Sequence, residues 1–226
     1  MDMVTVRNLK KYFGQGPRQV RAVDGVDLSV EKGKLTAIVG ASGSGKTTLL
    51  NLIGGLYPPT EGTVTVDGVD LGTLREEELT VFRRRRVGFV FQGCGLVPEL
   101  TVRENILLPL ALDGSRPDGV LFGELTELLG LKDKLDRFPR MLSGGGQQCA
   151  AIARALITRP SVILADEPTG SFDAKTSQNV AGLLKMTTDV FHQTLIMITH
   201  NVELAQLADR VVRLRDGRVV RYSQHS

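Results

Sequence analysis

The feature that most constrains this sequence is an apolar run that passes through a glycine-rich loop directly into a helical run. Residues 35–39 read LTAIV, which is typical of a buried strand, and residues 46–55 read KTTLLNLIGG, which is typical of a buried helix closed by glycines. A strand, a tight loop and a helix in this order predict an α/β unit near the start of the fold.

The loop itself, residues 40–47, matches the pattern G-x-x-x-x-G-K-[ST]. Its glycines let the backbone curl so that successive N–H groups and the positive end of the helix dipole point at phosphate oxygens. Lys46 adds positive charge toward the β- and γ-phosphates, and the Thr47 hydroxyl is a ligand for Mg²⁺. The predicted nucleotide-binding residues here are Gly40, Ser42, Gly43, Ser44, Gly45, Lys46, Thr47 and Thr48, and Lys46 is also a candidate catalytic residue.

Two carboxylates follow a second buried strand pattern, SVILADE at residues 161–167. The carboxyl ends of parallel strands meet at one edge of a sheet, so Asp166 and Glu167 are expected beside the glycine loop. Asp166 is positioned to hold the metal, and Glu167 is positioned to polarise the water that attacks the γ-phosphate. Together with the loop, they predict binding and hydrolysis of ATP with Mg²⁺.

The rest of the chain is expected to complete one domain over residues 1–226, an α/β P-loop NTPase core with a mostly parallel sheet. Strand patterns in the first third predict an N-terminal antiparallel β layer, and helical patterns from about residue 93 to about 158 predict an inserted helical subdomain. The expected strands are residues 4–6, 20–30, 35–39, 62–67, 87–92, 161–165 and 194–199, and the expected helices are residues 46–55, 74–86, 102–112, 120–131, 147–157 and 174–186.

Hydropathy gives no indication of a membrane span. The longest apolar stretch, residues 106–112, contains a proline and is far shorter than the about 20 residues that cross a bilayer. The first 13 residues alternate apolar and polar side chains and lack the apolar block of a signal peptide. We therefore expect a cytoplasmic protein.

Three further features are interpreted as structural. Cys94 and Cys149 lie far apart and have no neighbouring Cys or His at metal-ligand spacing, so both are expected to be ordinary thiols. The run of arginines at residues 83–86 is expected to be a solvated helix end rather than a nucleic-acid or lipid contact, because no aromatic residues are interleaved with it. No nucleic-acid partner is therefore expected.

Residues 142–145 read LSGG, and with the loop and the carboxylate pair this segment resembles the signature motif of ATP-binding cassette (ABC) proteins. The resemblance covers nearly all of the 226 residues. It implies that Ser143, Gly144 and Gly145 begin a helix facing the γ-phosphate held by a second ABC subunit, so that two subunits enclose two ATP molecules. A helix N-terminus with small residues suits that role physically.

The resemblance assigns roles to four more residues. Tyr12 resembles the aromatic residue that stacks on adenine, although a tyrosine here could also be a core or rim residue. Gln92 resembles the glutamine that senses Mg²⁺ and the attacking water, which makes it both a catalytic and a metal candidate. Asp173 resembles the loop aspartate that responds to the nucleotide site of the opposite subunit. His200 resembles the histidine that contacts the γ-phosphate, although it could also be a half-buried polar residue at a strand end.

The chain departs from the family pattern at two positions. The usual signature has a glutamine where this chain has Gly146 and an arginine where it has Cys149. A glycine in the first turn costs up to about 1 kcal/mol in helix propensity, and it lacks the amide side chain that could reach the sugar or phosphate across the subunit interface. We expect a working but slowed ATPase with a less tightly closed dimer.

Residues 49–56, 59–62, 89–92 and 96–101 are similar to the branch of the family that serves macrolide export, lipoprotein release and peptide-antibiotic defence. The resemblance implies a transmembrane permease partner, whose coupling helix would enter a groove behind Gln92 near residues 94–105, and a peripheral position on the inner face of the membrane. Two alternatives remain open: a regulatory, cell-division-type cassette that signals without transport, and a soluble ABC ATPase of DNA repair or translation.

Overall fold

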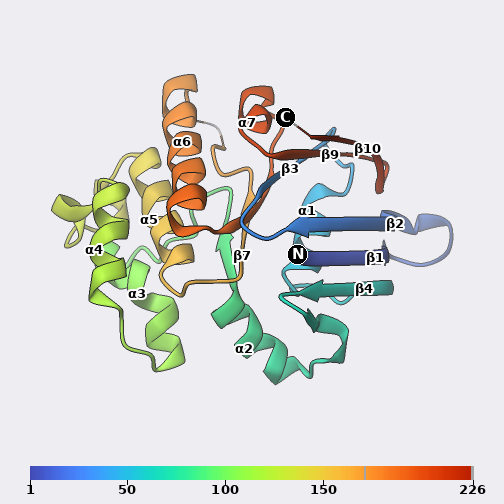
Figure 1. Cartoon of the computed structure of the whole chain (residues 1–226), viewed down its shortest axis with the longest axis horizontal. Coiled ribbons are helices and arrows are strands. Elements are labelled where there is room, and N and C mark those ends of the chain that lie inside the picture. The colour runs from blue at the N-terminus through green and yellow to red at the C-terminus, as the bar shows by residue number, and fades with distance from the viewer. Residues whose placement is uncertain (171, 225–226) are drawn as a thin grey trace.

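The computed structural model describes residues 1–170 and 172–224, which form two β-sheets with helices around them (Figure 1). The larger sheet has the strand order β10-β9-β3-β8-β7-β6. Its neighbours from β9 through β6 pair in parallel and β10 pairs antiparallel with β9, which confirms a mostly parallel sheet. The strands are β3 (Leu35–Val39), β6 (Val87–Val90), β7 (Val162–Asp166), β8 (Thr194–Ile198), β9 (Arg210–Arg215) and β10 (Arg218–Gln224).

The smaller sheet is the predicted N-terminal antiparallel layer, in the order β2-β1-β4-β5. Its strands are β1 (Asp2–Phe13), β2 (Val20–Glu31), β4 (Glu61–Val66) and β5 (Val69–Asp70). The sequence predicted a first strand of residues 4–6 only, because a bulge interrupts the pattern that would have indicated the rest of β1. Asn8 adopts a φ of 42°, and the pairing register shifts between Val6 and Leu9. This extra residue breaks the two-residue alternation that sequence reading relies on.

Helices cover both faces of the larger sheet, and alternate residues of its strands supply two separate cores. Ile163 and Ala165 of β7 face a core shared with α3 to α6, whereas Val162 and Leu164 face a core shared with α1 and the smaller sheet. The helices are α1 (Lys46–Ile53), α2 (Glu76–Arg86), α3 (Val102–Asp113), α4 (Gly119–Leu128), α5 (Gly144–Leu156), α6 (Ala174–Phe191) and α7 (Val202–Gln206), with 3-10 turns η1 (Gly16–Arg18), η2 (Leu71–Thr73), η3 (Lys132–Lys134) and η4 (Pro139–Met141).

Figure 1 places α3, α4 and α5 together on the side of the molecule away from β1, β2 and β4. This arrangement resembles the predicted helical insertion, whose limits near residues 93 and 158 remain a prediction. Within the described residues, no helix combines the length and the apolar content that crossing a bilayer requires.

The arginine run at the end of α2 is tied to the protein more closely than a solvated helix end would be. Arg84 and Arg85 both donate to Asp113 at the end of α3, and Arg86 donates to Asp67. The side chain of Arg84 is 28% exposed. These arginines therefore fasten α2 to its neighbours.

Candidate active site

The loop before α1 adopts a shape that requires glycine at two positions. Gly45, at the start of α1, has a φ of 98°, and a Cβ added there would collide with the carbonyl of Ala22. A Cβ on Gly40 would collide with the carbonyl of Leu214. The loop is therefore packed tightly between β2 and β9, which holds its N–H groups in a fixed arrangement.

Two polar side chains in this loop differ in their hydrogen bonding. The hydroxyl of Ser44 is buried and has no hydrogen-bonding partner among the described residues. The ammonium group of Lys46 donates to the carbonyls of Gly40 and Ala41, each at 2.9 Å. A buried hydroxyl without a partner is costly unless a ligand or water supplies one. The loop therefore supplies hydrogen-bond donors for the oxygens of a polyphosphate.

The hydroxyl of Thr47 faces the carboxylate of Asp166 across the pocket, with 3.4 Å between Oγ1 and Oδ1. Burial raises the pKa of Asp166, with a smaller contribution from Glu167, while the Thr47 hydrogen bond lowers it. Hydroxyl and carboxylate oxygens are the ligands that Mg²⁺ prefers. Among the described residues, no cluster of three or more His, Cys, Asp or Glu side chains could hold a metal ion. These oxygens therefore fit a metal that arrives with phosphates and water as its other ligands.

Glu167 and His200 meet because their strands are neighbours. They follow β7 and β8, which pair in parallel with Asp166 opposite Ile198. Nδ1 of His200 lies 2.9 Å from Oε1 of Glu167, and the other oxygen of Glu167 is buried with no partner in the described part of the chain. Glu167 adopts a φ of 45°, a conformation that non-glycine residues rarely take. Such strain is often found at functional sites.

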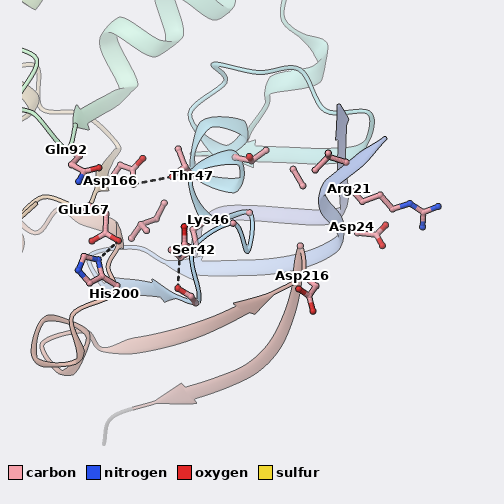
Figure 2. A pocket seen from close by; sticks show the side chains of 18 residues that line it. Arg21, Asp24, Ser42, Lys46, Thr47, Gln92, Asp166, Glu167, His200 and Asp216 are labelled. Carbon is pink, nitrogen blue, oxygen red and sulfur yellow. Dashed lines mark hydrogen bonds and ion pairs between the residues drawn. The ribbon is translucent and has the colours of Figure 1, made fainter. Parts of the chain in front are cut away.

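Except for Ser44, which is buried beneath the loop, these groups line one open pocket of about 810 Å³. Figure 2 shows Gln92, Asp166, Glu167 and His200 gathered on one side of the loop that carries Lys46. The predicted site residues that line the pocket are Gly40, Ser42, Gly43, Gly45, Lys46, Thr47, Thr48, Gln92, Asp166, Glu167 and His200. The pocket thus brings together the loop and the four strand-end residues that the sequence predicted.

Several pocket residues were missed by sequence reasoning. The pocket is also lined by Val20, Arg21, Ala22, Asp24, Ile198, Asp216 and Gly217. Asp216 and Gly217 form the turn between β9 and β10, and an Asp-Gly pair between two apolar runs is a recognised hairpin signal. Asp24 is also followed by a glycine, but this pair lies inside the continuous strand β2 and marks no turn. Only the three-dimensional approach of β2 to the loop places Arg21 and Asp24 here.

Tyr12 does not itself line this pocket. Its hydroxyl donates a 2.6 Å hydrogen bond to Asp24, which does line it, and the guanidinium of Arg21 lies 5.5 Å from the centre of its ring. Tyr12 instead lines a second pocket of about 580 Å³, which shares Arg21 and Asp24 with the first.

The signature residues also lie outside this pocket. Ser143 caps α5, and its hydroxyl accepts from the N–H of Gly146 at 3.2 Å. A Cβ on Gly144 would approach the ring of Phe172 to 2.8 Å. Asp173 caps α6, where its carboxylate accepts from the N–H and the hydroxyl of Thr176. The capping by Ser143 explains why α5 begins three residues before the predicted start.

The two altered signature positions have different surroundings. A Cβ on Gly146 would lie 3.4 Å from Leu142 and Ser143, so this position has room for a Cβ. Cys149 instead points into the helical core and is 7% exposed, and burial raises its pKa to about 11. Cys94 is also buried and donates from its thiol to Gln148 at 2.9 Å. Both cysteines are free thiols.

Comparison with known proteins gives consistent matches along the chain. The profile of the ABC transporter family matches residues 23–170. YvcR of Bacillus subtilis, named an ABC transporter ATP-binding protein, is 44% identical over 222 residues, which cover 96% of this chain and 86% of YvcR. MacB of Rhodopirellula baltica, named a macrolide export ATP-binding/permease protein, is 42% identical over 221 residues. That match covers 96% of this chain but 32% of MacB, so the chain spans about a third of that relative.

The fold also matches a solved structure of the cassette MJ0796, a protein of Methanocaldococcus jannaschii. That structure is described as dimeric, in a post-hydrolysis state bound to ADP and phosphate. The match has a TM-score of 0.88 and 38% identity and covers 98% of both chains.

Proposed function

This chain belongs to the ABC transporter family, and on that basis we propose that it is the ATP-binding and ATP-hydrolysing subunit that powers a separate membrane permease. The observation that carries the proposal is the arrangement of Lys46, Glu167 and His200 around a single pocket. The reaction is the conversion of ATP and water to ADP and phosphate, and its energy is used for transport.

Each group in the pocket has a role in that reaction. Lys46 and the loop N–H groups hold the phosphates of ATP. Thr47 and Asp166, with Gln92 nearby, would hold Mg²⁺, which neutralises charge that develops on the phosphates. The unpartnered oxygen of Glu167 is placed to accept a hydrogen bond from the attacking water, while His200 holds the other oxygen.

The functional unit is proposed to be a dimer with an identical or related cassette. The N-terminus of α5, with Ser143, Gly144 and Gly145, would face the nucleotide of the partner subunit, as would Asp173. The first N–H groups of a helix have no partner within the helix, which makes such a terminus suited to an anion. The dimeric state of MJ0796, a relative over nearly its whole length, supports this proposal.

The permease is proposed to dock in an apolar groove next to Gln92. This groove of about 520 Å³ is lined by Phe89, Phe91, Pro109 and Leu112 among others. Phe91 and Leu112 are 42% and 66% exposed, which is unusual for large apolar side chains near each other. A permease helix that covers them would contact the segment following Gln92 and place the protein at the inner face of the membrane. The export function in the name of MacB supports the macrolide-export branch as the type of system.

Purified protein tests the proposal through its ATP turnover. Wild-type protein should hydrolyse ATP in the presence of Mg²⁺, and Glu167→Gln should lower kcat by about 10²-fold or more while ATP still binds. Glu61→Gln is a suitable control, because Glu61 pairs with Lys10 on the exposed surface of the smaller sheet. Equal turnover by the wild type and Glu167→Gln would contradict the proposed role of Glu167.

A further inference from the structure

Asp24 is held by partners on two sides at one end of the nucleotide pocket. Oδ1 accepts the hydrogen bond from the Tyr12 hydroxyl, and Oδ2 accepts from two nitrogens of Arg218, at 2.7 and 3.2 Å. The Asp24 side chain is 12% exposed, so these partners replace most of its hydration. The bonds from Tyr12 and Arg218 also lower the pKa of Asp24, which keeps the carboxylate ionised near neutral pH.

The main chain fixes Asp24 as well. Its N–H donates to the carbonyl of Gly217 at 2.9 Å, and the N–H of Gly217 donates to the carbonyl of Ser44 in the phosphate loop at 3.0 Å. A Cβ on Gly217 would lie 3.0 Å from the carbonyls of Arg21 and Ala22, so the turn is pressed against β2. The turn between β9 and β10 therefore connects the phosphate loop to Asp24.

This end of the pocket is separated from the hydrolytic groups. Figure 2 shows Asp24 and Asp216 on the opposite side of Lys46 from Glu167 and His200. A nucleotide whose γ-phosphate lies near Glu167 would place its base toward Asp24. Stacking of a base on an aromatic ring contributes about 1–3 kcal/mol, and it requires the ring to be held in one orientation.

We propose that Asp24 is a positioning residue for the nucleotide base: it holds the Tyr12 ring at the base end of the pocket, and Arg218 holds Asp24. The inference rests on the proposed function, because it assumes that the pocket binds ATP. Tyr12 would contact a base that extends past Arg21 and Asp24 into the second pocket, which these two residues also line, whereas Asp24 and Arg218 act through Tyr12. The C-terminal hairpin thereby contributes to recognition of the base.

Calorimetry with two ligands tests the proposal, because inorganic tripolyphosphate has the phosphates of ATP without its base. Asp24→Ala should weaken binding of Mg-ATP by about tenfold and leave binding of Mg-tripolyphosphate unchanged. Tyr12→Phe, which keeps the ring and loses the hydroxyl, and Arg218→Gln should weaken Mg-ATP binding by about threefold each, again with no effect on tripolyphosphate. In turnover assays, KM for ATP should rise while kcat at saturating ATP stays the same.

The outcomes separate this inference from the proposed function. Glu61→Gln, on the same sheet but outside the pocket, should bind both ligands as the wild type does. Variants that bind Mg-ATP as tightly as the wild type, or that lose affinity for both ligands equally, would overturn the positioning role and leave the proposed function intact. A folded wild-type protein that binds neither ligand would overturn both.

Discussion

Nδ1 of His200 lies 2.9 Å from Oε1 of Glu167, while Oε2 of Glu167 is buried without a hydrogen-bonding partner among the described residues. One oxygen is therefore fixed by the histidine and the other is left for a ligand. The pair exists because β7 and β8 are adjacent parallel strands that end together. A carboxylate held in this way is oriented before any water arrives, which favours general-base chemistry.

His200→Ala should therefore lower kcat for ATP hydrolysis by about 10²-fold while affinity for Mg-ATP falls much less. The variant frees Glu167 to rotate and removes a contact proposed for the γ-phosphate. Steady-state kinetics of His200→Ala beside His192→Asn would measure this, because His192 lies at the C-terminal end of α6 and outside the pocket. A kcat equal to that of the wild type would show that the contact has no catalytic role.

Neighbouring glycines of α5 should respond in opposite ways to alanine. A Cβ at Gly144 would press on the ring of Phe172, so Gly144→Ala should destabilise the protein by about 1–3 kcal/mol. Gly146 has room for a Cβ, so Gly146→Ala should stabilise it by up to about 1 kcal/mol through helix propensity. The free energies of unfolding of the two variants in urea test these expectations. A loss of stability in Gly146→Ala would contradict the space inferred at that position.

Restoring the two usual signature residues should also give different results. Gly146→Gln should raise ATP turnover, because the position accepts a Cβ and a glutamine at the start of α5 can reach toward a partner subunit. Cys149→Arg should instead destabilise the fold, since position 149 is buried and Lys134 already places a positive charge near it. The arginine of the family pattern is therefore unsuited to this core. Turnover of Gly146→Gln and the melting temperature of Cys149→Arg are the measurements, and a stable, faster Cys149→Arg protein would contradict this account.

The link between α2 and α3 through Asp113 should weaken in acid. Hydrogen bonds from Arg85, Ser115 and Arg84 lower the pKa of Asp113 from 3.8 to about 2. Because the folded-state pKa lies below the unfolded value, the stabilisation is complete above about pH 4 and disappears as the pH falls through about 2. The difference in unfolding free energy between the wild type and Asp113→Asn should shrink over that range.

Urea unfolding between pH 7 and pH 2 measures that difference. Asp136→Asn serves as the control, because the Asp136 side chain is 89% exposed and should show little difference at any pH. A wild-type advantage over Asp113→Asn that grows as the pH falls would contradict the proposed link.

The part of the site that the sequence predicted consists of residues that are close in the chain or end a recognisable strand. Gly40, Lys46 and Thr47 belong to one continuous loop, and Glu167 directly follows an apolar run. Their meeting point follows from the rule that parallel strands present their carboxyl ends at one edge. The part of the pocket formed by the loop and Glu167 could therefore be predicted without the structure.

Asp24, at the other end of the pocket, could not be predicted in the same way. Asp24 lies in the middle of β2 and reaches the pocket because the turn at Gly217 packs against that strand. This contact joins residues that are almost 200 positions apart in the sequence. No local sequence pattern indicates such a contact. The missed length of β1 has a different cause, since the bulge at Asn8 removed the alternation that would have revealed the strand.

The central claim is that the loop before Lys46 binds ATP with its phosphates directed toward Glu167. Calorimetry of the Glu167→Gln protein with Mg-ATP, followed by its molecular mass in solution with and without nucleotide, tests this most directly, because bound ATP is not consumed. The account predicts saturable binding of one ATP per chain and a shift from monomer to dimer when ATP is present. A folded protein that takes up no ATP with Mg²⁺ present would contradict the account.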